Sequence, residues 1–229
     1  INYDRDFPNK IGDIRLSADN IEFDDVKQGE KPQVTLFLLN AGKKDYAPEL
    51  LHLPNYLTAK AEPATIRPGR VGKLVVTLKS NLLHGLGLTQ SSVYLSRFAG
   101  DRVNKDNELG ISVTLLPNFT AAELSSPQAP LAEMATDVDL GAFNGKSKLK
   151  GIVLLANKGQ SPLEIKMLQV YNPGLSVSLP KTTLRPGETT EMKIVVSTAV
   201  DRFRGSRKVL LITNDPRHPK ILVNVTTKK

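Results

Sequence analysis

Short runs with apolar residues at every second position recur along the whole chain. Examples are residues 33–40 (QVTLFLLN), 73–80 (KLVVTLKS), 190–198 (TEMKIVVST) and 220–227 (KILVNVTT). Successive side chains of a β-strand point to opposite faces, so this period predicts strands with one buried face. Pro and Gly interrupt the runs about every ten residues, a spacing typical of a β-sandwich. The chain is therefore predicted to be all-β.

One stretch departs from this pattern. Residues 120–130 (TAAELSSPQAP) begin with Thr120, a favourable N-cap, and Glu123 follows three residues later. This pair predicts a capping box and a helical turn, which the following prolines would end. We expect the turn to lie in a linker between two domains, over residues 117–132.

Two short motifs occur twice, in the same order and at nearly the same offset. Asn40-Ala-Gly42 matches Asn157-Lys-Gly159, and Ile66-Arg-Pro-Gly69 matches Leu184-Arg-Pro-Gly187. The apolar residues upstream and downstream keep this register, which indicates internal repetition of a unit about 100 residues long. We therefore predict two tandem immunoglobulin-like (Ig-like) β-sandwich domains. Their expected ranges are 14–116 and 133–229, after an N-terminal connector at residues 1–13.

Each repeated motif has turn chemistry. In the Asn-x-Gly motif we expect residues that tolerate positive φ and let the chain turn back. In the Arg-Pro-Gly motif Pro sets the φ of the second turn position, and Gly takes the positive φ of a type II turn.

The net charge of +8 is uneven along the chain. Residues 1–118 hold 15 Lys and Arg against 14 Asp and Glu, whereas residues 119–229 hold 16 against 9. A basic surplus favours an anionic partner, or it is simply a solvated surface. The candidate contacts to such a partner are Arg202, Arg204, Arg207 and Lys208. Aromatic residues do not interleave with them, which argues against nucleic acid.

Motifs for catalysis or metal binding are missing. The chain has no cysteine, and His52, His84 and His218 are not spaced as metal ligands. The acids of residues 22–25 (EFDD) fit solvated strand charges better than a calcium site. No catalytic, cofactor-binding or metal-binding residue is predicted, and no cofactor is expected.

The two copies differ in two loops. Residues 96–107 (SRFAGDRVNKDN) replace the shorter TNDPRHP turn of the second copy, and we expect a long, loose hairpin there. Residues 82–90 (LLHGLGLTQ) place leucines in a loop, either as an exposed apolar patch or as residues buried between the domains.

The order of these motifs resembles a bacterial family. Residues 23–30 (FDDVKQGE), 63–69 (PATIRPG) and 212–221 (ITNDPRHPKI) are similar to the domain-of-unknown-function family numbered 1573. This family is Ig-like and related to the ASH and major-sperm-protein group. The resemblance covers residues 14–229 and implies the periplasm or cell envelope of a Gram-negative bacterium. Residues 7–17 resemble a connector of multi-domain envelope members, so we expect a further domain and an export signal upstream.

One departure from the family limits what the resemblance implies. Family members often carry a Cys-Gly-Cys-Thr segment, where this chain has residues 50–60 in the first copy and 167–177 in the second. Any metal, redox or disulfide role of that segment does not carry over. The family itself has no settled activity.

The leading interpretation is a non-enzymatic structural or interaction module of the bacterial cell envelope. It would bind a protein or glycan through sheet edges and loops. The alternative is a binder of anionic polymer, either nucleic acid or acidic glycan, through the basic second domain. A hydrolase with a dispersed active site is a third reading without a supporting motif. No apolar run approaches the roughly 20 residues of a membrane helix, and the sequence does not indicate an oligomeric state.

Overall fold

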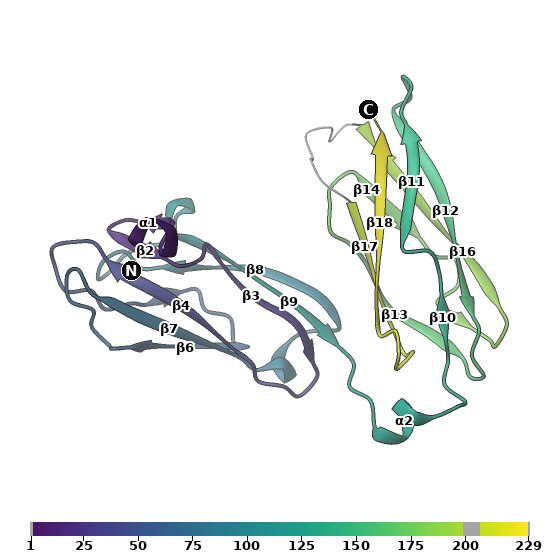
Figure 1. Ribbon diagram of the computed structural model, residues 1–229, viewed down its shortest axis with the longest axis horizontal. Coiled ribbons are helices and arrows are strands. Elements are labelled where there is room, and N and C mark those ends of the chain that lie inside the picture. Colours follow the sequence, from purple (N-terminus) through teal and green to yellow (C-terminus); the bar gives the residue numbers. More distant parts are fainter. Residues whose placement is uncertain (1, 199–206, 229) are drawn as a thin grey trace. The chain divides into compact units, whose positions relative to one another are not determined.

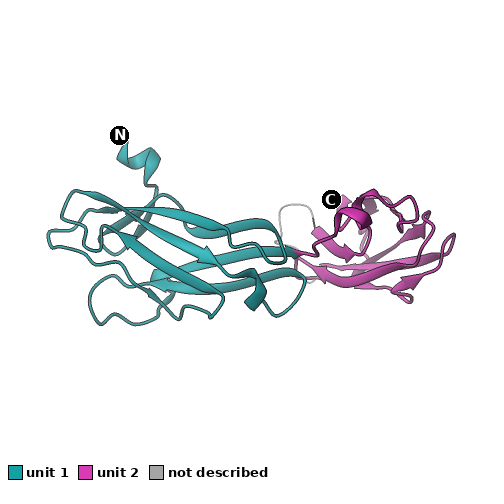
Figure 2. Cartoon of the chain, turned by 90° about the horizontal axis from the view of Figure 1, so that it is seen from below, with its two compact units in different colours: residues 1–115 teal, residues 116–229 magenta. Residues whose placement is uncertain are grey.

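The regular secondary structure of the chain consists almost entirely of β-strands (Figure 1). The computed structural model describes residues 2–198 and 207–228. The chain divides into two compact units, residues 1–115 and 116–229 (Figure 2). Each unit contains two sheets packed around an apolar core, which confirms the predicted fold class of two tandem Ig-like β-sandwiches.

The first unit pairs a five-stranded sheet, in the order β1-β2-β4-β7-β6, with a four-stranded sheet, in the order β3-β9-β8-β5. Its elements are α1 (Tyr3–Asp6), β1 (Asn9–Ile11), β2 (Ile14–Leu16), β3 (Asn20–Lys27), β4 (Gln33–Asn40), β5 (Leu50–Leu51), β6 (Leu57–Glu62), β7 (Val71–Leu78), the 3-10 helix η1 (Ser80–Leu82), β8 (Gly87–Leu95), the 3-10 helix η2 (Lys105–Asn107) and β9 (Glu108–Leu116).

The second unit pairs a four-stranded sheet, in the order β10-β12-β16-β14, with a five-stranded sheet, in the order β11-β18-β17-β13-β15. Its elements are α2 (Ala121–Ser125), β10 (Ala132–Glu133), β11 (Asp137–Ala142), β12 (Lys148–Asn157), β13 (Leu163–Val170), β14 (Leu175–Ser178), β15 (Thr183–Leu184), β16 (Thr189–Ser197), β17 (Arg207–Thr213) and β18 (Lys220–Lys228).

The two units correspond strand by strand. The central ladder β2-β4-β7-β6 of the first unit matches β10-β12-β16-β14 of the second, and β3-β9-β8-β5 matches β11-β18-β17-β13. Both cores consist mainly of Leu, Ile and Val from the inward positions of these strands. Burial of each such side chain stabilises the fold by about 1.5–3 kcal/mol relative to leaving it exposed.

The Asn-x-Gly and Arg-Pro-Gly motifs pack against each other. In the first unit the buried Asn40 amide donates to the carbonyls of Lys44 at 2.8 Å and Ile66 at 2.9 Å. The Gly69 N–H donates to the Asn40 carbonyl at 2.7 Å. Gly69 has φ +76°, and the Arg70 N–H donates to the Arg67 carbonyl. The predicted glycine of a type II turn is confirmed.

The second unit repeats these bonds. The Asn157 amide donates to the carbonyls of Ser161 at 2.8 Å and Leu184 at 3.0 Å, and Gly187, with φ +82°, donates to the Asn157 carbonyl. The two sequence motifs are therefore a single structural unit, in which one buried asparagine joins two turns.

The expected role of the Asn-x-Gly glycine is wrong. Neither Gly42 nor Gly159 has a positive φ. A Cβ on Gly42 would lie 3.1 Å from the Asp13 Cβ, and one on Gly159 would lie 2.5 Å from the Leu131 backbone nitrogen. Glycine is needed because another segment approaches closely and leaves no room for a side chain.

Two local expectations are confirmed. Thr120 caps α2, since its hydroxyl accepts from the Glu123 N–H at 3.1 Å and the Glu123 carboxylate accepts from the Thr120 N–H at 3.3 Å. Glu22, Asp24 and Asp25 of β3 are exposed. Asp24 has φ +57°, an irregularity that returns Val26 to the core three residues after Phe23.

Residues 9–11 pair with β2, and Ile11 is buried in the first core. This part of the predicted connector therefore belongs to the sheet of the first unit. Among the described residues, no helix has the length and apolar character needed to cross a membrane.

Candidate binding surfaces

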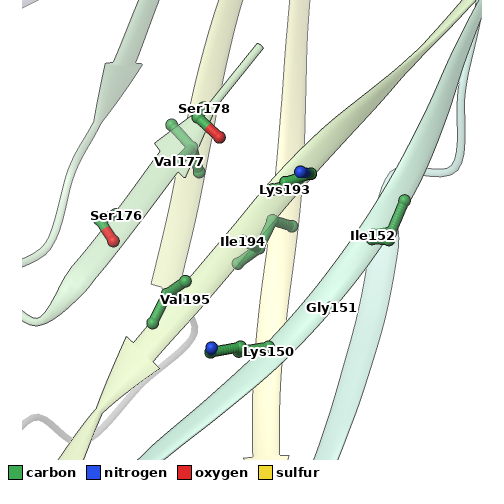
Figure 3. Close-up of a pocket in the computed structure, with 9 residues that line it drawn as sticks. All are labelled: Lys150, Gly151, Ile152, Ser176, Val177, Ser178, Lys193, Ile194 and Val195. Carbon is green, nitrogen blue, oxygen red and sulfur yellow. The ribbon is translucent and has the colours of Figure 1, made fainter. Parts of the chain in front are cut away.

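A groove runs over the outer face of the β12-β16-β14 sheet in the second unit (Figure 3). It has a volume of about 570 Å³. Outward side chains of three neighbouring strands line it: Lys150 and Ile152 of β12, Lys193 and Val195 of β16, and Ser176 and Ser178 of β14. The register places Ile152 opposite Lys193 and Val195 between Lys150 and Ser176.

The face carries apolar side chains that the fold does not bury. Ile152 is 56% exposed, and Leu154, two residues further along β12, is 58% exposed. Val153 and Leu155, which alternate with them, lie in the core. Strand β12 is thus apolar on both faces, although only one face has a sheet to cover it.

The lysines beside these apolar side chains have no partner of opposite charge. Among the described residues, neither the Lys150 nor the Lys193 side chain makes a salt bridge or hydrogen bond. The groove therefore combines an uncovered apolar strip with two ammonium groups that are free to meet a carboxylate.

The matching groove of the first unit has a similar volume, about 580 Å³, and different chemistry. Thr35 lies opposite Val75, and this pair matches Ile152 and Lys193 of the second unit. Gln33 lies opposite Thr77, and this pair matches Lys150 and Val195. The Glu62 carboxylate of β6 lies 3.4 Å from the Lys73 ammonium and 3.9 Å from the Lys60 ammonium. This groove is mainly polar and its charges are paired, although Phe37, the counterpart of Leu154, is 46% exposed further along β4. The combination of an exposed isoleucine with unpaired lysines is therefore specific to the groove of the second unit.

No sequence motif predicted this groove. The available signal was the run of residues 152–156 (IVLLA), which is apolar at both strand parities. Such a run predicts a strand buried on both faces, and only the structure shows that one face is open.

The basic residues proposed as polyanion contacts are only partly described. Arg202 and Arg204 lie outside the described residues. Arg207 is buried, with 6% of its surface exposed, and its Nη1 donates to the Thr227 hydroxyl at 3.4 Å. The Lys208 N–H donates to the Asn172 side chain at 2.8 Å. Their use as a binding site stays a prediction.

The histidines lie apart. The His52 ring packs edge-on against Tyr94, with centroids 5.8 Å apart. The His218 Nδ1 lies 2.9 Å from the carboxylate of the fully buried Asp215. Over residues 2–198 and 207–228, no group of three or more His, Cys, Asp or Glu side chains is placed to hold a metal ion.

The expected loose hairpin at residues 96–107 is wrong. The Asp101 carboxylate accepts from the Arg97 guanidinium at 2.8 and 3.0 Å, and from the N–H groups of Arg97 and Arg102. The guanidinium and these N–H groups hold the pKa of Asp101 well below its usual value. The charge of Asp101 adds to burial in raising the pKa of Tyr46. The loop is ordered around one ion pair.

The leucines of residues 82–90 pack mainly within the first unit. Leu83 is buried in its core and Leu86 packs against that core, while Leu82 is 44% exposed. This segment therefore forms no large apolar patch.

Comparison with sequence families supports the fold. The profile of the family described as "HYDIN/CFA65/VesB-like, Ig-like domain" matches residues 130–228. This match confirms an Ig-like fold for the second unit, which is the Ig-like part of the resemblance. The assignment to the numbered family stays a prediction. No curated protein has significant similarity to the chain.

One solved structure shares the fold of this chain over most of its length. A protein of unknown function from Porphyromonas gingivalis W83 has a TM-score of 0.72 at 21% identity, over 95% of this chain and 100% of that chain. The Vibrio cholerae VesB protease has a TM-score of 0.37 at 11% identity, over 77% and 64% of the two chains. The YadV chaperone has a TM-score of 0.33 at 14% identity, over 93% and 98%. The likeness to the Porphyromonas gingivalis protein shows the fold alone.

Proposed function

We propose that this protein is a non-enzymatic interaction module of the bacterial cell envelope that binds a protein partner through the groove on β12, β16 and β14. The observation that carries the proposal is the difference between the two matching grooves. The groove of the first unit carries Gln33, Thr35 and the Glu62–Lys73 ion pair, whereas that of the second exposes Ile152 beside the unpaired side chains of Lys150 and Lys193. Exposed apolar patches rimmed by polar groups favour protein contacts.

The chemistry of the groove favours a protein segment over a glycan. Sugar rings commonly stack on aromatic side chains, and the described residues that line this groove include none. Ile152 and Val195, with Leu154 next to the groove on β12, offer an apolar strip to Val, Leu or Ile side chains of a partner. Lys150 and Lys193 offer ammonium groups to its Asp or Glu side chains, which would steer association and fix its register.

The envelope location and the membership in the family numbered 1573 are parts of this proposal. Both are supported by the resemblance of residues 23–30, 63–69 and 212–221, and the location also by that of residues 7–17. Fractionation of the native bacterium checks the location. Recovery of the full-length protein in the cytosolic fraction would contradict it.

Photo-crosslinking tests the groove directly. A photoreactive amino acid replaces Ser178 at the rim of the groove, and a matched one replaces Lys60, its counterpart in the first unit. In the native host we expect Ser178 to yield one dominant crosslinked protein that Lys60 does not yield.

A groove exchange provides the matched control. Ile152→Thr with Lys193→Val gives the second groove the side chains of the Thr35–Val75 pair, and we expect the crosslink at Ser178 to disappear. The reverse pair, Thr35→Ile with Val75→Lys, leaves the second unit intact and should leave that crosslink unchanged. A crosslink that survives the first exchange would overturn the proposal.

A further inference from the structure

The linker of this chain lies across the Asn-x-Gly turn of the second unit. The Lys158 N–H donates to the Leu131 carbonyl at 2.8 Å, and the Gln160 N–H donates to the Ala129 carbonyl at 3.2 Å. The Ser161 hydroxyl donates to the Gln128 carbonyl. Residues 128–131 thus form an extended segment held mainly through its backbone, directly over Gly159.

The first unit has the same turn without this cover. The Ala41 N–H donates to the Asp13 carbonyl at 3.0 Å, which repeats the Lys158 bond. The chain before Asp13 reverses at Gly12, with φ +58°, and runs back along β2 as β1. Among the described residues, the Lys43 N–H, the counterpart of the Gln160 N–H, therefore has no acceptor.

The two units also differ at one residue of the loop that packs against this segment: Asp215 in the second unit and Arg97 in the first. At the end of β17, the buried Asp215 accepts from the Ala132 N–H at 2.8 Å and fastens the linker to the second unit. The register places Arg97 at the matching position after β8. A Cβ on Gly12 would lie 3.1 Å from the Arg97 side chain, and Asp101 holds the guanidinium. Arg97 offers no acceptor at this position.

The uncovered turn opens into a cavity of about 1050 Å³. Its walls are residues 12–14, the turn at 40–47 and residues 96–99. At its rim Phe98 is 61% exposed, with the Arg97 guanidinium 5.9 Å from the ring centroid. An exposed aromatic ring and a free backbone N–H on the wall of one cavity suit the apolar ring and the carbonyl of a proline-containing peptide.

We propose that this cavity binds an extended, proline-containing peptide segment, in the manner in which residues 128–131 lie on the second unit. The peptide would accept a hydrogen bond from the Lys43 N–H and place a prolyl or other apolar side chain on Phe98. Acidic side chains (Asp13, Asp45 and Glu49) balance Lys43 and Lys44 on the cavity wall, so the site does not favour a free anion. It is distinct from the groove of the proposed function.

The test uses the chain's own segment as the probe. A capped peptide with the sequence of residues 125–132 (SSPQAPLA) is titrated into the full-length, isotope-labelled protein, and its amide NMR shifts are followed. We expect saturable shifts at residues 41–44 and at Phe98. No saturable shift at millimolar peptide, or shifts confined to other residues, would refute the proposal.

Variants separate the two contacts. Lys43→Pro removes the donor and Phe98→Ala removes the ring, and each should weaken binding by about fivefold or more. Val103→Ala changes an exposed side chain of the same loop that does not line the cavity, and it should leave binding unchanged. If Lys43→Pro disturbs the turn, the peptide affinity of Phe98→Ala alone tests the proposal. An unchanged affinity in that variant would overturn it.

Discussion

Asn40 and Asn157 each join two turns from the interior of a sandwich. Both side chains are buried, and each donates two hydrogen bonds and accepts at least one. A buried carbonyl that loses its donor retains its full desolvation cost, so these residues stabilise more than an average hydrogen bond would. Glycine follows two residues later because the segment that crosses the turn leaves no room for a Cβ.

Asn157→Ala should be strongly destabilising. The change leaves the Ser161 and Leu184 carbonyls without their donor, and we expect the free energy of unfolding to fall by roughly 2–4 kcal/mol. Urea titration followed at resonances of the second unit measures this, since the two units need not unfold together. Gln160→Ala, at an exposed position of the second unit, is the control and should be near neutral. Equal effects of the two changes would contradict the role of Asn157.

Asp101 should make the first unit sensitive to acid. Its folded-state pKa is lowered, chiefly by its hydrogen bonds to the Arg97 side chain. The stabilisation is therefore fully present above the unfolded-state pKa near 4, and is lost as pH falls from there toward the folded-state pKa. Asp101→Asn should lower the urea midpoint at about pH 7, and the gap to the parent protein should narrow at about pH 2.5.

The control for this pH dependence is Asp19→Asn, which changes an exposed carboxylate without a salt bridge to a described residue. It should keep the parent's acid sensitivity. A gap for Asp101→Asn that stays constant between the two pH values would show that the carboxylate charge does not stabilise the loop.

At the scale of strands, the same three-stranded surface carries different chemistry in the two units. In the groove, strands β4, β7 and β6 present Gln, Thr, one valine and paired charges, whereas β12, β16 and β14 present Ile152, Val195, two serines and unpaired lysines. The backbone register is the same in both, so the difference lies in outward side chains that contribute little to either core. These positions are free to vary for binding without cost to the fold.

The packing of residues 128–131 on the second unit should depend on Gly159, which these residues cover. A Cβ on Gly159 would meet the backbone of residues 129–131, which has no flexible end that can move aside. We expect Gly159→Ala to displace the linker and to lower the unfolding free energy of the second unit by about 1–3 kcal/mol. Amide hydrogen exchange should accelerate at Gln160, whose N–H bonds the linker. Gly85→Ala, where a Cβ meets no atom within 4 Å, is the control, and unchanged exchange in Gly159→Ala would contradict the packing.

At the scale of the whole molecule, the basic surplus lies almost entirely in the second half of the chain. The polyanion alternative predicts that Arg202→Ala with Arg204→Ala lowers the salt concentration of elution from heparin. The decrease should exceed that caused by Lys158→Ala with Lys166→Ala, which removes the same charge elsewhere on the second unit. Equal decreases would indicate a nonspecific response to net charge.

The sequence by itself determined the strands, the two copies of the sandwich, the type II turns at Gly69 and Gly187, and the capping box at Thr120. The strands, the turns and the cap are local: they follow from residue period, from the dihedral angles of Pro and Gly, and from contacts within four positions. The two copies follow from the repetition of these local motifs in one register. The tertiary structure decided the open groove, because the apolar run at residues 152–156 does not specify which of its faces another sheet covers. It also decided the cavity of the first unit, because Gly12, Lys43 and Arg97 are far apart in sequence and meet only when the sheets pack.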